Sequence, residues 1–341
     1  MDVINAGRGQ PELSVILTAY NQEAYVKEAL ESVLSQEGLV AEILVSDDCS
    51  SDRTFAIVQD IAHAYDGPHH LSIRRTKKNI GQHNNVCQLV EMAATSFIVM
   101  ANGDDISFSH RCRRLLDEMR STGADVLSSN SIEINAKGHE IGLRVSGVLS
   151  RNITASEVIR SGYLAESYGA SMAWSKRVYQ TLPSLDASRL PEGIDTVLPF
   201  RGALLGGMHY IDEPLLKIRR HAGQLTHKIF NQREQMMFQE SLPSVSMFAY
   251  ICMLRDLKYL MQDPSAAQKA SYQPLHEELE TRILQIVEEW MELRSELWND
   301  GWRPDWKPKE EWSILSENRF KGFRESTRNR VRRLRWRLLR K

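Results

Sequence analysis

The sequence places acidic side chains directly after apolar, strand-like runs, where carboxylates can bind a ligand or a metal ion. Asp104 and Asp105 follow the apolar run Phe97–Met100 and the turn-forming pair Asn102–Gly103. Two adjacent carboxylates at such a turn suit a hard divalent cation such as Mg²⁺ or Mn²⁺, which prefers oxygen ligands and often shares them with substrate phosphates. A solvated turn is the competing interpretation, because Gly-Asp is common turn chemistry.

A second acidic cluster follows the run Ala41–Val45. Ser51 or Asp52 is best explained as the N-cap of the next helix, where oxygen side chains and negative charge are favoured. Asp48 is different, because a carboxylate at the end of a strand can accept a hydrogen bond from a nucleobase imide. The cluster therefore indicates one helix cap and one candidate ligand contact.

Several common catalytic motifs are missing from the chain. The sequence has no Walker A motif, no G-x-G-x-x-G and no G-x-S-x-G, which removes support for P-loop ATPases, dinucleotide-binding dehydrogenases and hydrolases with a nucleophile elbow. Its four cysteines lie far apart, so neither a metal knuckle nor a disulfide framework is indicated.

The first third of the chain alternates between strand-like and helix-like segments. Apolar residues at helical spacing fill the segments between the strands, as in Ala24–Ser35 and Val86–Ala94. This alternation predicts a parallel α/β sheet whose ligands bind at the carboxyl ends of the strands. The expected strands are Leu13–Leu17, Ala41–Val45, His70–Arg74 and Phe97–Met100. From about Leu225 onward the strand signals fade and helical spacing predominates.

The charge is distributed unevenly along the 341 residues. The net charge is -1, but residues 321–341 contain ten basic side chains and one acidic one. This segment has the composition of a basic amphipathic helix, which favours an anionic membrane surface as its partner, with a solvated tail as the alternative. No nucleic acid partner is expected. The sequence shows no secretory signal and no apolar run long enough to cross a bilayer, so we expect a cytoplasmic protein, peripheral on the inner face of the membrane.

Four blocks in register carry a resemblance to a known family. They are SVILTAYNQEAYVKEALESVLSQ, EILVSDDCSSDRT, NIGQHNNVCQLVEMA and FIVMANGDDI, and a fifth block begins PEGIDTVLPFRGALLGG. Together they resemble the inverting family-2 glycosyltransferases of the GT-A type from about Glu12 to Thr226. The resemblance implies an α/β nucleotide-diphospho-sugar transferase sandwich, with a mainly parallel sheet flanked by helices and a helical C-terminal extension.

The resemblance also implies roles for individual residues. Asp105 would bind Mn or Mg, and Asp195 matches the catalytic base, with Glu192 as the less favoured alternative. Asp104 would contact the ribose or the sugar, and Asp48 would bind a uracil or thymine base. The other substrate-binding positions implied are Thr18, Tyr20, Asn21, Asn79 and Gly81. Positive charge near the departing diphosphate could come from Arg219, Arg220 or His221.

Two residues depart from the pattern of the family. Asn102 stands where the family often has the first acid of Asp-x-Asp, and Ile194 stands where a Glu commonly precedes the base. These departures keep open a non-catalytic glycan-binding or scaffold protein with the same fold. A nucleotidyltransferase is less favoured, because the segment TAYNQEAY after the first strand has no basic phosphate-binding loop.

The expected function is metal-dependent transfer of a sugar, with inversion, from a UDP or dTDP donor. The acceptor would be a hydroxyl of a glycan or a lipid-linked acceptor in cell-surface polysaccharide synthesis. The expected domains are a glycosyltransferase domain at 1–225, a helical region at 226–320 and the basic tail at 321–341. Within the first domain, residues 12–112 would bind the nucleotide-sugar and residues 113–225 would form the acceptor side.

Overall fold

The computed structural model describes residues 2–6, 9–161, 164–183, 185, 194–221, 249–262, 271–283 and 285, which all belong to one compact unit formed by residues 1–293. Residues 249–260 and 271–283 are helical, as the helical spacing of this region predicts. The basic tail 321–341 lies outside the described residues. In the part of the chain that is described, no helix has both the length and the apolar character needed to cross a membrane.

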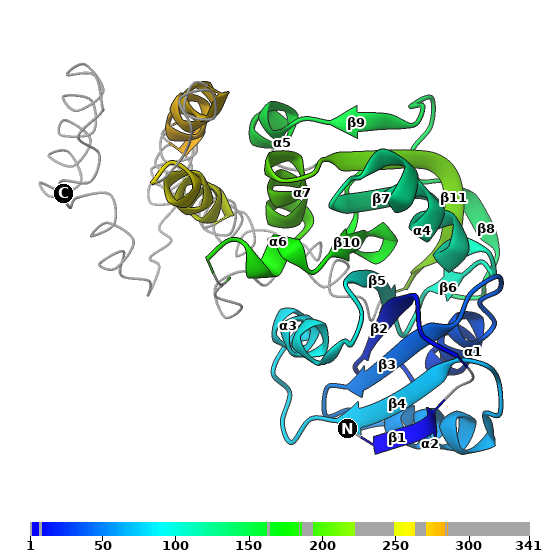
Figure 1. The fold of residues 1–341 in the computed structure, drawn as a ribbon. Coiled ribbons are helices and arrows are strands. Elements are labelled where there is room, and N and C mark those ends of the chain that lie inside the picture. The colour runs from blue at the N-terminus through cyan, green and yellow to red at the C-terminus, as the bar shows by residue number, and fades with distance from the viewer. Residues whose placement is uncertain are drawn as a thin grey trace, which may run out of the picture. The chain divides into compact units, whose positions relative to one another are not determined.

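One mixed sheet of eleven strands organises the molecule (Figure 1), with the order β1-β4-β3-β2-β5-β10-β7-β11-β6, β8 beside β7 and β9 beside β11. The strands are β1 (Asp2–Ala6), β2 (Leu13–Ala19), β3 (Ala41–Asp47), β4 (His70–Arg75), β5 (Phe97–Asn102), β6 (Ile106–Ser107), β7 (Val126–Asn135), β8 (Glu140–Leu143), β9 (Arg151–Ile153), β10 (Ala173–Ser175) and β11 (Met208–Arg220). The helices are α1 (Val26–Leu34), α2 (Thr54–Ala64), α3 (Gln82–Met92), α4 (Arg111–Thr122), α5 (Ala155–Ser161), η1 (Gly169–Ser171), α6 (Arg177–Gln180) and α7 (Ile194–Leu204).

The strands β4, β3, β2 and β5 pair in parallel and form the centre of the first half. All seven residues of β2 are buried, because strands flank it on both edges and helices cover the sheet. This explains why Leu13–Ala19 reads as an apolar run without the alternation of a half-exposed strand. The predicted α/β fold with a mainly parallel sheet flanked by helices is confirmed.

The helices of the first half lie close to their predicted positions. In α1 the buried residues are Val26, Ala29, Leu30 and Val33, a helical spacing that puts one apolar stripe on the sheet. Arg53 occupies the N-cap position of α2, but the Asp52 carboxylate accepts a hydrogen bond of 2.9 Å from the Thr54 N–H. The carboxylate that the sequence assigns to the cap therefore makes a capping contact from one position earlier.

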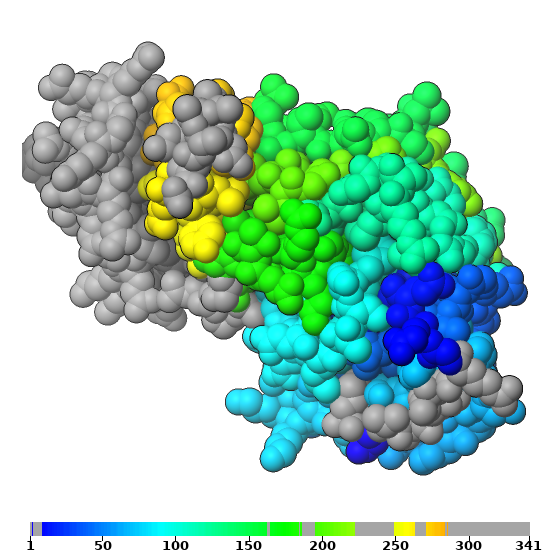
Figure 2. All heavy atoms as spheres, viewed as in Figure 1, coloured from blue at the N-terminus to red at the C-terminus, as the bar shows by residue number. Residues whose placement is uncertain are grey.

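The second half of the sheet is built around the parallel pair β7 and β11. The short strand β10 pairs antiparallel with both β5 and β7 and so joins the two halves. Residues of the two halves, cyan and green in Figure 2, meet in one continuous surface on the face shown there. The thirteen-residue β11 also pairs with β6, which follows the acidic turn directly.

The strand ends that carry polar residues lie side by side. Thr18 is in register with Asn102 on β5, and Ala19 is in register with Asp47 on β3. The turns that follow β2, β3 and β5 therefore leave the sheet at one edge. The two acidic clusters named from the sequence therefore lie next to each other and to the turn after β2, at the carboxyl ends of the strands.

Candidate active site

The turn between β5 and β6 buries two carboxylates at the edge of the sheet. Asp104 and Asp105 are each only 7% exposed, and the Gly103 N–H donates a 2.9 Å hydrogen bond to the Thr18 carbonyl. A Cβ atom on Gly103 would lie 2.4 Å from the Gln22 Oε1 atom and 2.9 Å from the Ala19 Cβ atom. Gly103 is therefore needed for close approach, because any side chain would push the turn away from β2.

Asp105 is held by two hydrogen bonds. The Asn102 side-chain amide donates to Oδ2 at 3.0 Å, and the Arg219 backbone N–H donates to Oδ1 at 3.0 Å. Burial, and next the charge of Asp104, raise the pKa of Asp105 to about 7. Asn102 thus orients the carboxylate that follows it, a role that an acid at this position could not fill when ionised.

Arg219 supports the turn from β11. Its side chain is buried, and its Nε atom donates to the Asp104 carbonyl at 3.1 Å. Its Nη2 atom donates to Glu28 at 2.5 Å, and its guanidinium lies 4.8 Å from the centre of the Tyr25 ring. The Arg219 side chain therefore braces the turn instead of presenting an exposed charge to a ligand.

His221 reaches the carboxylate pair, whereas Arg220 is turned to another partner. The Nε2 atom of His221 lies 3.0 Å from Asp104 Oδ2, and its ring contacts Tyr25 with 4.6 Å between ring centres. Arg220 pairs with Glu133. Of the three basic residues named from the sequence, only His221 brings its side chain to an acidic side chain of the turn.

The acidic turn has the chemistry of a site for a hard cation. Burial and the neighbouring Asp104 charge both disfavour an ionised Asp105, and a divalent cation would relieve this. Among the described residues, no group of three or more His, Cys, Asp or Glu side chains is arranged to hold a metal. Two carboxylates completed by diphosphate oxygens and water nevertheless fit Mg²⁺ or Mn²⁺.

Asp48 fixes the loop that precedes α3. Its Oδ2 atom accepts a 2.8 Å hydrogen bond from the Gly81 N–H, and its Oδ1 atom accepts from the Ile80 N–H and the Thr76 hydroxyl at 3.0 Å each. Asn79 accepts from the same Gly81 N–H at 3.0 Å. The three residues predicted here, Asp48, Asn79 and Gly81, thus form one cluster. Each carboxylate oxygen has two lone pairs, so Oδ2 retains one acceptor position.

The loop after β2 joins the loop after β3 through Asn21. Its N–H donates to the Ser50 hydroxyl at 2.9 Å, and its side-chain oxygen accepts from the Ser51 N–H at 2.8 Å. Asn21 adopts a φ of 51°, a left-handed conformation that asparagine tolerates better than most residues. Thr18 is buried in the same region, while Tyr20 is 45% exposed.

Asp195 lies in the first turn of α7 and packs against η1. The Ser167 hydroxyl donates to the Asp195 carbonyl at 2.8 Å. A Cβ atom on Gly169 would lie 2.5 Å from Asp195 Oδ1, so the carboxylate rests directly on the Gly169 backbone. The alternative base, Glu192, lies outside the described residues.

Tyr168 connects the two acidic regions, and the sequence analysis missed it. Burial, then the charges of Asp105 and Asp195, raise the pKa of its hydroxyl. Its ring also lies 4.0 Å from the Arg144 guanidinium. Tyr168 is therefore within electrostatic range of both the acidic turn and Asp195. No local motif marks it, because its neighbours come from separate parts of the sheet.

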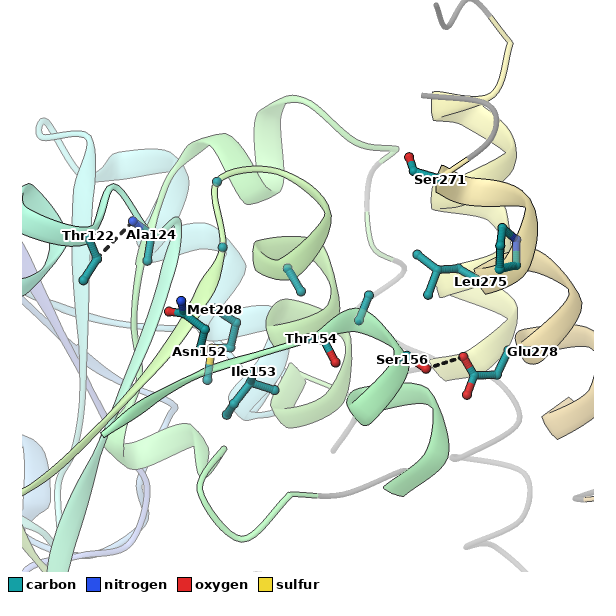
Figure 3. A pocket seen from close by; sticks show the side chains of 15 residues that line it. Thr122, Ala124, Asn152, Ile153, Thr154, Ser156, Met208, Ser271, Leu275 and Glu278 are labelled. Atoms are coloured by element: carbon teal, nitrogen blue, oxygen red, sulfur yellow. Dashed lines mark hydrogen bonds between the residues drawn. The ribbon is translucent and has the colours of Figure 1, made fainter. Parts of the chain in front are cut away.

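A separate hollow of about 520 Å³ lies at the amino-terminal ends of β7 and β11, far along the sheet from the Arg219 end of β11 (Figure 3). In its wall the Ser156 hydroxyl donates to Glu278 at 2.6 Å. None of the residues predicted to bind substrate or metal lines this hollow. The candidate active site is therefore at the opposite end of these strands.

Comparisons with known proteins agree with this architecture. Uncharacterized protein Rv1520 of Mycobacterium tuberculosis is 26% identical over 239 residues, which cover 65% of this chain and 63% of that protein. Succinoglycan biosynthesis protein ExoO of Rhizobium meliloti is 26% identical over 46% of this chain and 44% of its own. The chain thus spans less than two thirds of the length of these relatives.

A solved structure shares the fold. Residues 1–349 of S. aureus TarS, in complex with UDP-GlcNAc, superpose with a TM-score of 0.53 at 16% identity, covering 83% of each chain. Residues 14–177 match the family model described as glycosyl transferase family 2, and this segment contains the acidic turn and Tyr168. Over residues 14–177 the chain is therefore similar to glycosyl transferase family 2, and its fold is of the GT-A type.

Proposed function

We propose that this protein is a metal-dependent, inverting glycosyltransferase that moves a sugar from a nucleotide-diphosphate donor to a hydroxyl group. The observation that carries the proposal is that two acidic residues from separate elements, Asp105 of the acidic turn and Asp195, both lie within electrostatic range of Tyr168. Asp104 and Asp105 come from the end of β5, and Asp195 comes from α7. One acidic group can serve the donor diphosphate through a metal while the other accepts a proton, a division of roles that glycosyl transfer requires.

The donor would bind along the edge formed by the ends of β2, β3 and β5. Thr18, Tyr20 and Asn21 would line the nucleotide pocket, and the remaining acceptor position on Asp48 would take the imide hydrogen of a uracil or thymine base. This is why we favour UDP or dTDP. The neighbouring Asn79–Gly81 loop would approach the donor. Support for a nucleotide-sugar donor comes from TarS, which shares the fold and was solved with UDP-GlcNAc.

Asp105 would be the direct metal ligand, and Asp104 would contact the ribose or the sugar. A bound Mn²⁺ or Mg²⁺ would neutralise the negative charge that builds on the departing diphosphate. The chain holds Asp105 in place through Asn102 and the Arg219 N–H. Asp105 would thus be oriented before the donor arrives.

Asp195 would act as the general base. It would take the proton from an acceptor hydroxyl while that oxygen forms a bond to the anomeric carbon. The bond between that carbon and the diphosphate oxygen breaks in the same displacement, and the nucleotide diphosphate leaves with the bonding electrons. Because the attack comes from the face opposite the leaving group, the anomeric configuration inverts.

The acceptor would be a glycan or a lipid-linked acceptor in cell-surface polysaccharide synthesis. The name of ExoO, a succinoglycan biosynthesis protein, supports this setting. The basic tail 321–341 would hold the enzyme at an anionic membrane surface on the cytoplasmic side. In this proposal residues 1–225 form the transferase domain and residues 226–320 a helical region.

The proposal can be tested by ligand binding and by turnover. Thermal unfolding is measured with UDP, dTDP, GDP and CMP, each with and without Mn²⁺. A ligand at about a hundred times its Kd should add about 2.7 kcal/mol to the free energy of unfolding, and only UDP or dTDP with metal should give this shift. Release of nucleotide from the corresponding donor sugars is then followed for wild type, Asp105→Asn and Asp195→Asn.

Both variants should lose turnover by about 10²-fold or more while keeping the fold. Asp117→Asn is the matched control, because Asp117 is exposed on α4 and pairs with the neighbouring Arg113. Wild-type turnover in either variant would count against the assignment. No thermal shift with any nucleotide would favour the non-catalytic scaffold instead.

A further inference from the structure

Arg111, the first residue of α4, is a buried cation in an unfavourable place. It is 1% exposed, and no carboxylate among the described residues lies within ion-pairing distance of its guanidinium. Its Nε atom has no hydrogen-bond partner. It also sits at the helix N-terminus, the positive end of the helix dipole. A buried charge in such a setting contributes little to stability compared with an apolar side chain of similar size.

The guanidinium joins two segments of the candidate active site. Its Nη1 atom donates to the Ser107 hydroxyl at 2.9 Å, and its Nη2 atom donates to the Ala170 carbonyl at 2.8 Å. Ser107 is two residues after the acidic turn. Ala170 belongs to η1 and directly follows Gly169, on which the Asp195 carboxylate rests. The two hydrogen bonds therefore connect the acidic turn to η1, the segment on which the Asp195 carboxylate rests.

The neighbouring Asp105 offsets part of the cost of burying the Arg111 charge. Burial lowers its pKa to about 10, so the guanidinium is a cation at neutral pH. Asp105 is close enough that its negative charge partly offsets that effect, and Arg111 in turn favours the ionised form of Asp105. A neutral donor could make the same two hydrogen bonds, but it would leave the acidic turn with less compensation.

We propose that Arg111 is a positioning residue that fixes the separation between the acidic turn and Asp195. This inference rests on the proposed function, because it assigns Asp105 and Asp195 to the two sides of one reaction. Arg111 touches no substrate in this proposal. It acts through Ser107 on one side and through η1 on the other. The distance between the metal-binding group and the proton-accepting group is thereby fixed.

The position of Arg111 predicts which kinetic constants should change. The acidic turn is held independently by Asn102 and Arg219, so loss of Arg111 should leave the donor and metal site largely intact. The η1 segment loses a hydrogen-bond donor at Ala170, so Asp195 should shift. A residue needed only for folding would instead lower the amount of active protein and leave the kcat of the folded fraction unchanged.

The test compares Arg111→Met, Arg111→Lys and the control Arg113→Met in the full chain. Arg113 lies on the same helix, and its guanidinium pairs with the exposed Asp117 and with Glu12 at the surface. Hydrolysis of UDP-glucose, dTDP-glucose and UDP-GlcNAc with Mn²⁺ is measured as nucleotide release, and the fastest of these donors is used. Binding of UDP with Mn²⁺ is measured separately by thermal shift and by calorimetry.

In Arg111→Met we expect kcat to fall by about tenfold or more, because a misplacement of about 1 Å is enough for such a loss. The Kd for UDP with Mn²⁺ should stay within about threefold, and Arg111→Lys should recover part of the kcat because it keeps the charge and one donor. Arg113→Met should behave as wild type. Unchanged kcat in Arg111→Met, or equal losses of kcat and UDP–Mn²⁺ affinity, would overturn the proposal.

Ser107→Ala provides a second variant if Arg111→Met does not fold. It removes one of the two acceptors of the guanidinium while leaving the charge in place, and kcat should fall by a few fold. Wild-type kcat in Ser107→Ala would then overturn the proposal. A wild-type protein that hydrolyses none of the donors and shows no metal-dependent thermal shift with UDP would refute the proposed function itself. Failure of the proposed function can therefore be told apart from failure of the Arg111 proposal.

Discussion

Replacement of Gly169 by alanine should displace the Asp195 carboxylate and little else. The added Cβ atom would lie 2.5 Å from Asp195 Oδ1 and 3.3 Å from its Cγ atom. An ordinary contact begins near 3.4 Å, so the carboxylate oxygen must move by about 0.9 Å. Gly169 does not have the positive φ that disfavours alanine, so the backbone of η1 accepts the substitution. The change therefore acts on the side chain of Asp195, the base in the proposed reaction.

The expected cost follows from that displacement. A misplacement of about 1 Å in a reacting group can lower the rate by about 10²-fold, which corresponds to about 2.7 kcal/mol of transition-state stabilisation. The assay is steady-state nucleotide release from the donor sugar with Mn²⁺, together with calorimetric binding of UDP. We expect kcat to fall by about 10²-fold, while the affinity for UDP with Mn²⁺ is unchanged, because Asn102 and the Arg219 N–H hold Asp105 without Gly169.

Gly142→Ala is the matched control. Gly142 also lacks a positive φ, and a Cβ atom there would meet no other atom within 4 Å. This variant should retain wild-type kcat. A Gly169→Ala protein with kcat within about twofold of wild type would refute the role of Asp195, because its carboxylate cannot stay where it is beside the new methyl group. An equal loss in both variants would show that the effect is not specific to Asp195.

Two further predictions concern the elements that support the site. Arg201 on α7 and Asp256 form a fully buried ion pair with N–O distances of 2.7 and 2.9 Å. Arg201→Met should lower the free energy of unfolding by about 3–5 kcal/mol, whereas Arg201→Met with Asp256→Leu should recover most of it, as urea unfolding can measure. Hydrogen bonds from the backbone N–H and the hydroxyl of Thr154, then the pairing with Arg151, lower the pKa of Glu157 to about 2. Because the folded-state pKa lies below the ordinary 4.5, this stabilisation is present above about pH 4.5 and is lost as the pH falls towards 2. Glu157→Gln should therefore be less stable than wild type at neutral pH, and the difference should shrink on acidification.

The parallel half of the fold could be predicted because its signals are local. The apolar run Leu13–Leu17 and the helical spacing of Ala24–Ser35 coincide with β2 and α1. β2, β3 and β4 are each followed by a helix, and they pair with one another in chain order. The polar turns at Asp48 and Asp105 could be assigned to one edge of the sheet for the same reason.

The second half of the sheet could not be predicted in the same way. β10 is only three residues long, and its place between β5 and β7 depends on strands far away in the sequence. β11 reads as one long segment, yet its end reaches back to the acidic turn, where the Arg219 N–H meets Asp105. The family resemblance named Arg219 as a source of positive charge near the donor, but the contact of its backbone N–H with Asp105 depends on residues more than a hundred positions apart.

A hydrogen bond inside the acidic turn explains why Asn102 does not argue against an active site. From the sequence alone, asparagine in place of an acid removes one negative charge. In the structure its amide donates to Asp105, which already repels Asp104 across the same buried turn. A third carboxylate would add repulsion and remove a donor. Asn102 therefore removes one negative charge from the turn and, in return, orients the Asp105 carboxylate. This is compatible with a metal ion bound by Asp105 and completed by oxygens of the donor diphosphate and water.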